Sequence, residues 1–196
     1  MGKLLYSKQR RFIYKTIRRI DLRMTTNIFL IGMPSSGKST LGRQIAKSLG
    51  YEFVDLDVRI EIAEGKKIAE IFTLNGEEYF RKAENQQLKK IAKDSKLVVA
   101  TGGGAPCHHD GLEYIKENGI SIFLDVKPEM LVERMRVSKK NERPLFDLES
   151  KSLLETISET YNSRLPIYQK ADITVEGDTD PESILWIIDA EFSRNK

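Results

Sequence analysis

The feature that most constrains this chain is the nine-residue segment Gly32-Met33-Pro34-Ser35-Ser36-Gly37-Lys38-Ser39-Thr40. An apolar stretch at residues 27–32 leads into it, and an amphipathic stretch begins within it and covers residues 38–49. In this context the pattern G-x-x-x-x-G-K-[ST] turns backbone N–H groups inward around phosphate oxygens, at the positive end of a helix. The segment therefore predicts a nucleotide-phosphate loop between a strand and a helix.

Two side chains of this loop are candidates for chemistry. Lys38 has the length to reach the β- and γ-phosphates of a nucleotide, and the Ser39 hydroxyl is placed to bind Mg²⁺. We therefore expect ATP and Mg²⁺ at this turn, with Lys38 as a catalytic residue. The predicted nucleotide-binding residues of the segment are Gly32, Pro34, Ser35, Ser36, Gly37, Lys38, Ser39 and Thr40.

Short apolar stretches alternate with helical stretches along the rest of the chain. The predicted strands are residues 27–32, 52–55, 96–100, 121–124 and 172–175. The predicted helices are residues 38–49, 58–63, 68–92, 111–117, 128–138, 152–169 and 181–192. Short apolar strands separated by crossover helices pair in parallel, which predicts a three-layer α/β/α fold with a five-stranded parallel sheet. Ligands of such sheets bind beyond the carboxyl ends of the strands.

A carboxylate that supports Mg²⁺ is expected at another strand end, and two residues compete for this role. Asp55 ends the predicted strand 52–55, and Asp125 follows the apolar residues 122–124. We favour Asp55, acting directly or through water, because Asp57 accompanies it and residues two apart in an extended segment face the same side. One carboxylate would then serve the metal and the other a substrate hydroxyl. In the alternative interpretation, Asp57 and Asp125 only cap the helices that follow them.

Charge is spread unevenly along the chain, whose formal net charge is +3. Residues 1–23 contain eight basic side chains and one acid, so the remainder is mildly acidic and gives little support for nucleic-acid binding. We interpret residues 1–24 as an accessory basic extension, with docking on an anionic partner or targeting as alternatives, and residues 25–196 as one domain. Charged residues make up 31% of the chain and no uncharged apolar run approaches 18 residues, which excludes a membrane span. The single cysteine, Cys107, suits a cytoplasmic protein.

Four further segments carry a family resemblance. They are Phe80-Arg81-Lys82-Ala83-Glu84, Thr101-Gly102-Gly103-Gly104-Ala105, Glu142-Arg143-Pro144-Leu145 and Tyr161-Asn162-Ser163-Arg164-Leu165-Pro166-Ile167-Tyr168. With Asp55-Leu56-Asp57 and the phosphate loop, in this order and spacing, they closely resemble the shikimate kinase family. The resemblance covers the chain from about residue 28 onward. It implies Mg²⁺-dependent transfer of the ATP γ-phosphate to the 3-hydroxyl of shikimate, in aromatic amino-acid biosynthesis.

On the acceptor side, the resemblance implies a binding segment at residues 56–84. Asp57 would bind the ring hydroxyls of shikimate and act on the attacking one, either as a base or by orienting it. Arg81 and Arg164 would hold the shikimate carboxylate. The backbone of a glycine run would approach the acceptor and the γ-phosphate. This run consists of Gly102, Gly103 and Gly104.

On the nucleotide side, the resemblance implies a mobile lid at residues 138–148. Arg143 of this lid would close over the phosphates, where a cation that arrives on closure contributes to catalysis. Arg136 would lie over the adenine, and Pro181 would belong to the adenine loop.

General chemistry supports a carboxylate-binding role for Arg81 independently of the resemblance. A planar guanidinium binds a carboxylate through two parallel hydrogen bonds, which a lysine cannot do. The alternative is an ion pair within the helix, because Glu84 follows three residues later and Glu77 precedes by four. Both interpretations hold together if Glu84 keeps Arg81 in position.

Two predicted C-terminal helices carry large aromatic side chains. One helical face carries Tyr161, Arg164 and Tyr168, as their spacing shows. The alternative to a binding role is that this face packs into the hydrophobic core, with Arg164 at the edge of the core. Trp186 lies in the apolar helix 181–192 and is expected in the core.

Two other functions compete with the one that the resemblance implies. One is a different small-molecule kinase of the same class, such as one acting on gluconate. The other is a nucleotide-binding regulatory or nucleic-acid-associated module that uses the basic extension. We expect a shikimate kinase that acts on ATP and shikimate as a cytoplasmic monomer, without a nucleic-acid partner.

Overall fold

The computed structural model describes residues 25–137, 152–176 and 179–194, so the predicted lid and the basic extension lie outside the described residues. Each predicted strand and helix has a counterpart whose ends differ by a few residues at most. The strands are β1 (Asn27–Ile31), β2 (Glu52–Asp55), β3 (Leu97–Ala100), β4 (Gly119–Asp125) and β5 (Ile173–Glu176). The helices are α2 (Lys38–Leu49), α3 (Leu56–Glu64), α4 (Ile68–Leu88), the 3₁₀ helix η1 (Ala105–Cys107), α5 (Gly111–Asn118), α6 (Pro128–Val137), α7 (Leu153–Tyr168) and α8 (Pro181–Arg194).

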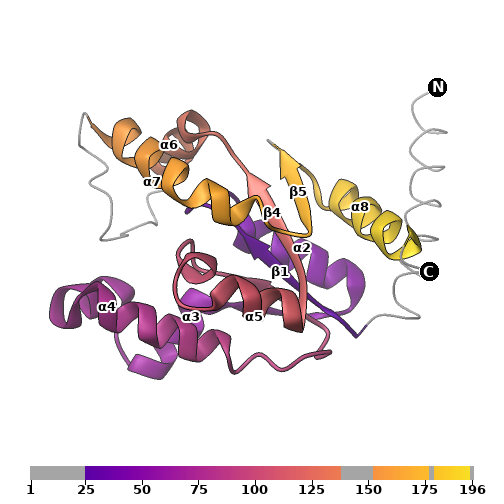
Figure 1. Cartoon of the computed structure of the whole chain (residues 1–196), viewed down its shortest axis with the longest axis horizontal. Helices are drawn as coiled ribbons and strands as arrows, with labels where there is room; N and C mark the ends of the chain where they lie inside the picture. The colour runs from indigo at the N-terminus through magenta and orange to yellow at the C-terminus, as the bar shows by residue number, and fades with distance from the viewer. Residues whose placement is uncertain (1–24, 138–151, 177–178, 195–196) are drawn as a thin grey trace.

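The strands form one sheet in the order β2-β3-β1-β4-β5, and every neighbouring pair is parallel (Figure 1). β1 lies in the middle, where Ile28 is level with Val98 of β3 and with Ile120 of β4. All of β1 is buried, which explains why its sequence is an almost continuous apolar run. Because the strands are parallel, their carboxyl ends share one edge of the sheet.

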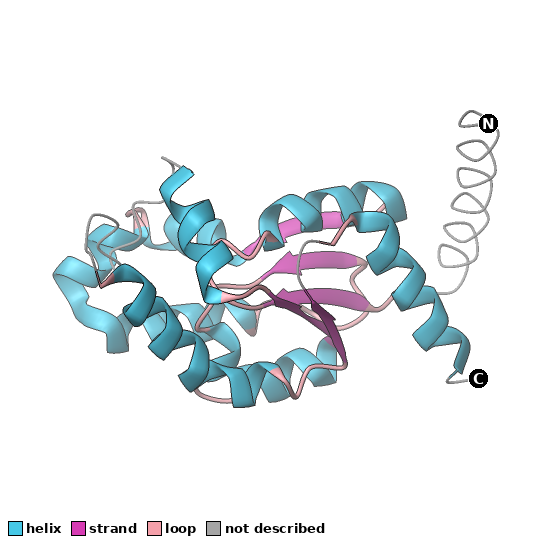
Figure 2. Cartoon of the chain, turned by 90° about the horizontal axis from the view of Figure 1, so that it is seen from above, coloured by secondary structure: helices cyan, strands magenta, loops and turns pink. Residues whose placement is uncertain are grey.

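Helices cover both faces of the sheet, as the view in Figure 2 shows. α2 and α8 pack on the face that carries Ile28 and Leu30. α3, α4, α5, α6 and α7 contribute to the larger core on the opposite face, around Phe29 and Phe123. The three-layer α/β/α prediction is confirmed. Within the described residues, no helix combines the length and the apolar character needed to cross a membrane.

Two helices differ from what the sequence predicted. α4 is interrupted at Gly76, whose φ of 81° and ψ of 174° are not helical, and the glycine permits this break because it has no side chain. The prediction that Trp186 is in the core is wrong, since the residue is 58% exposed. α8 turns Ile184 and Ile188 toward the sheet instead.

The amino-terminal end of β1 is held by the buried side chain of Asn27. Its Nδ2 donates hydrogen bonds to the carbonyl oxygens of Ala92 and Asn118, at 2.7 and 3.1 Å. Its Oδ1 accepts hydrogen bonds from the backbone N–H groups of Ser95 and Leu97, both at 3.1 Å. One amide group therefore satisfies backbone groups from two separate segments, residues 92–97 and the end of α5.

Replacing Asn27 by alanine is expected to lower the free energy of unfolding by about 3 kcal/mol, because each buried backbone group left without a partner costs about 1–3 kcal/mol. Urea unfolding followed by circular dichroism measures the change. The control is Asn75→Ala at an exposed position of α4, where a change below about 0.5 kcal/mol is expected. Equal stability of the two variants would contradict this role of Asn27.

Candidate active site

The phosphate loop begins at Gly32, directly after β1. Gly32 has a φ of +137°, and a Cβ atom there would lie 2.8 Å from the carbonyl oxygen of Leu124, so a larger residue does not fit. The chain then turns through positive φ values at Ser35 and Gly37, and α2 starts at Lys38. The predicted nucleotide residues all lie on this turn or in the first turn of α2: Gly32, Pro34, Ser35, Ser36, Gly37, Lys38, Ser39 and Thr40.

The ammonium group of Lys38 is held by this loop. Lys38 is buried, and its Nζ donates hydrogen bonds to the carbonyl oxygens of Gly32 and Met33, at 2.9 and 2.7 Å. A longer contact of 3.4 Å joins it to the Ser36 hydroxyl. The loop therefore fixes one positive charge next to the helix N-terminus, where charge and backbone N–H groups together favour an anion.

The two residues predicted to bind Mg²⁺ are in contact with each other. Ser39 Oγ donates a hydrogen bond to Asp55 Oδ2 at 2.7 Å. A hydroxyl and a carboxylate are the hard oxygen ligands that Mg²⁺ prefers, so the residues present fit this ion. Asp125, the other candidate, accepts a hydrogen bond from the Tyr161 hydroxyl at 2.6 Å and is engaged in attaching α7. The geometry favours Asp55.

Asp57 does not share a strand face with Asp55, so that prediction is wrong. β2 ends at Asp55, and Asp55 caps α3 by accepting a hydrogen bond from the backbone N–H of Asp57 at 3.2 Å. Asp57 therefore lies in the first turn of α3, and the residue that caps this helix is Asp55. The Asp57 side chain still reaches the edge of the sheet, since a Cβ atom on Gly102 would lie 2.9 Å from its Oδ1.

The glycine run after β3 connects the phosphate loop to α7. A Cβ atom on Gly103 would lie 3.0 Å from Cδ of Pro34 and 3.2 Å from Nη1 of Arg164. The backbone of Gly103 thus has the phosphate loop on one side and a guanidinium group on the other. A residue with a side chain would have to displace one of them.

The other two glycines of the run face α4. A Cβ atom on Gly102 would collide with Oε1 of Glu84, and one on Gly104 would collide with the guanidinium group of Arg81. The run is therefore explained by close packing against charged side chains. It brings the predicted acceptor residues from α3, α4 and α7 to one backbone segment.

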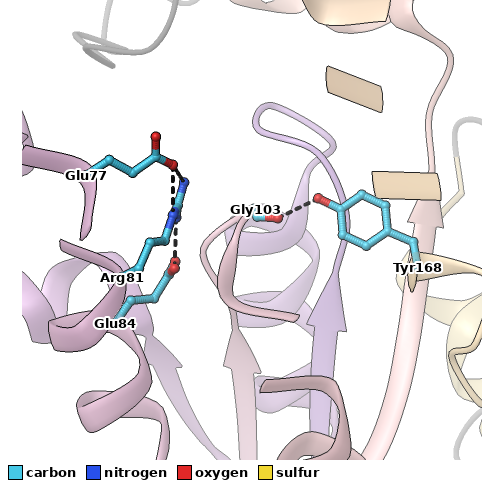
Figure 3. Close-up of polar contacts among 5 residues, drawn as sticks. All are labelled: Glu77, Arg81, Glu84, Gly103 and Tyr168. Atoms are coloured by element: carbon cyan, nitrogen blue, oxygen red, sulfur yellow. Dashed lines mark hydrogen bonds and ion pairs between the residues drawn. The ribbon is translucent and has the colours of Figure 1, made fainter. Parts of the chain in front are cut away.

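Arg81 is buried between two carboxylates of its own helix (Figure 3). Its Nε and Nη2 contact Glu77 Oε1 at 3.1 and 2.9 Å, and its Nη1 contacts Glu84 Oε2 at 2.8 Å. Burial opposes the charge of Arg81, but the attraction of Glu84 and then of Glu77 outweighs it and raises the pKa of the guanidinium. Both ion pairs predicted from the spacing are confirmed, and they fix a charged guanidinium beside Gly104.

Two tyrosine hydroxyls attach α7 to the edge of the sheet. Tyr161 donates to Asp125 Oδ1 at 2.6 Å, and Tyr168 donates to the carbonyl oxygen of Gly103 at 2.5 Å (Figure 3). Both tyrosines are buried, as their predicted shared face requires, and Arg164 lies between them in sequence with partial exposure. The attachment of the helix on either side of Arg164 explains how its guanidinium reaches Gly103.

Sequence reasoning missed Arg134. Its Nη1, reaching from α6, contacts the carbonyl oxygens of Ser35 and Ser36 at 3.5 and 3.3 Å. Arg136, predicted to lie over the adenine, is exposed and two residues further along the same helix, hence on a different face. Nothing in the local pattern signals the role of Arg134, because the contact joins residues 99 positions apart.

Three predicted residues of the nucleotide side stay predictions: Arg136, Pro181 and Arg143. Pro181 is the first residue of α8 and is partly exposed. Arg143 lies outside the described residues.

Two binding regions thus meet at one edge of the sheet. The phosphate loop with Lys38 suits the triphosphate of a nucleotide. The buried guanidinium of Arg81, with Arg164 across the glycine run, suits a small carboxylic acid. A region suited to a phosphate donor and one suited to an acidic acceptor, both at the same strand ends, define the class of protein, a P-loop kinase of small molecules.

Comparison with known proteins identifies the family. The family model described as shikimate kinase matches residues 34–190. A shikimate kinase of Clostridium botulinum is 42% identical over 164 residues, which cover 84% of this chain and 95% of that protein. One of Aquifex aeolicus is 39% identical over 158 residues, which cover 81% and 90% of the two chains. The chain belongs to the shikimate kinase family, and the expected kind of enzyme, an ATP-dependent kinase, is confirmed with it.

Solved structures agree with this assignment. The shikimate kinase from Acinetobacter baumannii in complex with shikimate superposes with a TM-score of 0.79 at 31% identity, covering 92% of this chain and 98% of the other. A gluconokinase from Sinorhizobium meliloti has a TM-score of 0.54 at 20% identity, over 88% and 94% of the two chains. The second likeness shows the fold alone and gives no support for gluconate as the acceptor.

Proposed function

We propose that this protein transfers the γ-phosphate of ATP to the 3-hydroxyl of shikimate, which gives shikimate 3-phosphate and ADP for aromatic amino-acid biosynthesis. The observation that carries the proposal is the environment of Gly103, with Pro34 of the phosphate loop on one side and Arg164 on the other. Family membership supports it, and so does the structural likeness to a relative solved in complex with shikimate.

On the acceptor side, Arg81 and Arg164 bind the carboxylate and Asp57 binds the ring hydroxyls. Guanidinium groups are suited to a carboxylate because each offers parallel N–H donors and a permanent charge. A carboxylate such as that of Asp57 accepts hydrogen bonds from hydroxyl groups, so it orients the attacking one. The backbone of the glycine run, which is packed between the side chains of these residues, contacts the acceptor.

On the nucleotide side, Lys38 neutralises charge that develops on the transferred phosphoryl group. Arg136 is proposed to lie over the adenine, and Arg134 of the same helix holds the phosphate loop through the carbonyl oxygens of Ser35 and Ser36. Arg143 supplies a further cation from the lid. Ser39 and Asp55 would hold Mg²⁺, which offsets the negative charge of the β- and γ-phosphates when bound.

Coupled measurement of ADP release by the purified full-length protein tests the proposed function. We expect turnover that requires both Mg-ATP and shikimate, and no turnover when gluconate replaces shikimate. Absence of shikimate-dependent turnover would overturn the proposal. Equal turnover with gluconate would show that the acceptor region does not select for shikimate.

The Mg²⁺ assignment predicts a specific effect of Asp55→Asn. The neutral amide is a weaker ligand than a carboxylate, so the Mg²⁺ concentration that gives half-maximal turnover is expected to rise about tenfold or more. The matched control is Asp125→Asn, which removes the alternative carboxylate while an amide oxygen still accepts from Tyr161. A larger shift in the Asp125 variant than in the Asp55 variant would reverse the assignment.

The protein is further proposed to act as a cytoplasmic monomer, with residues 1–24 as an accessory extension. The single cysteine, Cys107, suits a reducing compartment. Light scattering coupled to size-exclusion chromatography tests the monomer, and a dimer mass would contradict it.

A further inference from the structure

One buried polar atom of the acceptor region is left unused by the proposed reaction. Glu84 is 1% exposed, and its Oε2 contacts Arg81 Nη1 at 2.8 Å. Its other oxygen, Oε1, is the only buried side-chain polar atom without a hydrogen-bond partner in the described part of the chain. A charged carboxylate with one unsatisfied oxygen is costly in a buried position.

A second carboxylate lies near this unsatisfied oxygen. A Cβ atom on Gly102 would collide with Glu84 Oε1 and lie 2.9 Å from Asp57 Oδ1, so both oxygens border the same glycine. Protonation would turn Oε1 into a hydrogen-bond donor, and the nearby Asp57 carboxylate could accept from it. The charged and titratable groups around Glu84 come from four elements: Glu77 and Arg81 of α4, Asp57 of α3, Cys107 of η1, and Arg164 and Tyr168 of α7.

Arg81 is the cation in direct contact with Glu84, and it is already shared with Glu77. The Glu77 side chain is 55% exposed and solvated by water, whereas that of Glu84 is 2% exposed. Burial raises the pKa of Glu84 to about 7, even though Arg81 acts in the opposite direction. Of the two carboxylates on this guanidinium, Glu84 is therefore the one closer to protonation near neutral pH.

We propose that binding of the acidic substrate at Arg81 drives uptake of one proton from solution by Glu84 Oε1. This inference rests on the proposed function, because it requires the carboxylate of the acceptor to bind Arg81. A third carboxylate on the same guanidinium weakens its attraction for Glu84 and adds a like charge nearby, and both effects favour the neutral acid. One O–H bond forms, the proton comes from the buffer, and Oε2 continues to accept from Arg81.

The direction of the pH dependence follows from linkage. Below about pH 7 the free protein already carries the proton on Glu84, so binding takes up little. Above that pH the free Glu84 is charged and the complex must take the proton up. The affinity for the acceptor therefore falls as pH rises above 7, with a limiting slope of about tenfold per pH unit for one proton.

Titration calorimetry of shikimate into the full-length protein measures the uptake without any catalysis. Binding heats are compared in phosphate and Tris, whose ionisation enthalpies differ. We expect roughly 0.5–1 proton per shikimate at pH 8 and less than about 0.2 at pH 5.5. Binding with no dependence on the buffer at pH 8 would overturn this inference alone. A lack of binding in either buffer would count against the proposed function instead.

Two matched variants assign the proton to its residue. Glu84→Gln mimics the protonated acid, because its amide oxygen accepts from Arg81 and its NH₂ group donates toward Asp57, so uptake at pH 8 is expected to fall below about 0.2. Glu77→Gln changes the exposed partner of the same guanidinium and is expected to keep the uptake. Uptake that persists in the Glu84 variant would overturn the assignment. If that variant does not fold, the pH series on the unmodified protein still decides whether the proton is taken up.

Discussion

Replacing Lys38 by methionine is expected to reduce kcat by about 10³-fold at saturating Mg-ATP and shikimate. The carbonyl oxygens of Gly32 and Met33 hold the Lys38 ammonium within the loop, next to the proposed phosphate site. Removing one such preorganised group from a phosphoryl- or acyl-transfer site costs about 10²–10³ in rate, and the loss of a full charge lies at the upper end. Methionine keeps an unbranched apolar stem, so the packing of the loop is largely retained.

Lys47→Met is the control for this experiment. Lys47 lies in the last turn of the same helix α2 and is exposed, so its replacement removes a charge without touching the loop. We expect its kcat to stay within about twofold of that of the unmodified protein. Steady-state ADP release at several ATP concentrations measures both variants. If the Lys38 variant kept more than a tenth of the turnover, the ammonium group would not be a catalytic charge.

The parts of this site that lie close together in sequence were predictable. A glycine-rich turn after an apolar strand specifies a phosphate loop by local geometry, and Gly32 and Lys38 lie where this pattern puts them. The pairing of Arg81 with Glu77 and Glu84 follows from helix periodicity alone. In each case the interacting residues belong to one or two adjacent elements, so no knowledge of tertiary structure is needed.

The position of Asp57 shows where local reasoning fails. Residues two apart face the same side only while the strand continues, and here the strand ends at Asp55. A single hydrogen bond from the Asp57 backbone N–H to the Asp55 side chain starts the helix instead. An aspartate at this position is compatible with either a strand end or a helix cap, so the sequence does not decide between them.

Contacts between distant segments could not be predicted. Arg134 meets the phosphate loop only because α6 follows β4, and β4 is the neighbour of β1 in the sheet. The unsatisfied oxygen of Glu84 likewise exists because the turn after β3 brings Gly102 against α4. Both depend on strand order, which alternating helices and strands do not specify.

Replacing Arg81 by lysine is expected to raise the KM for shikimate about 100-fold and to leave the KM for ATP within about twofold. Lysine keeps a positive charge for the buried Glu84, so the fold does not have to accommodate an unpaired carboxylate. It loses the planar pair of donors that binds a carboxylate through two hydrogen bonds. Charge-assisted hydrogen bonds contribute about 1.5–3 kcal/mol each, and a loss of about 3 kcal/mol corresponds to roughly a hundredfold in affinity.

This substitution also decides between the two interpretations of Arg81. If the guanidinium only joins Glu77 and Glu84 within α4, lysine is a nearly equivalent partner, and the kinetics with shikimate stay unchanged. If it binds the acceptor, the effect appears in the KM for shikimate and not in that for ATP. Lys82→Ala, which removes an exposed cation paired with Glu78 on the same helix, is the matched control and is expected to alter neither constant. An unchanged KM for shikimate in the Arg81 variant would leave Arg164 as the residue that binds the carboxylate.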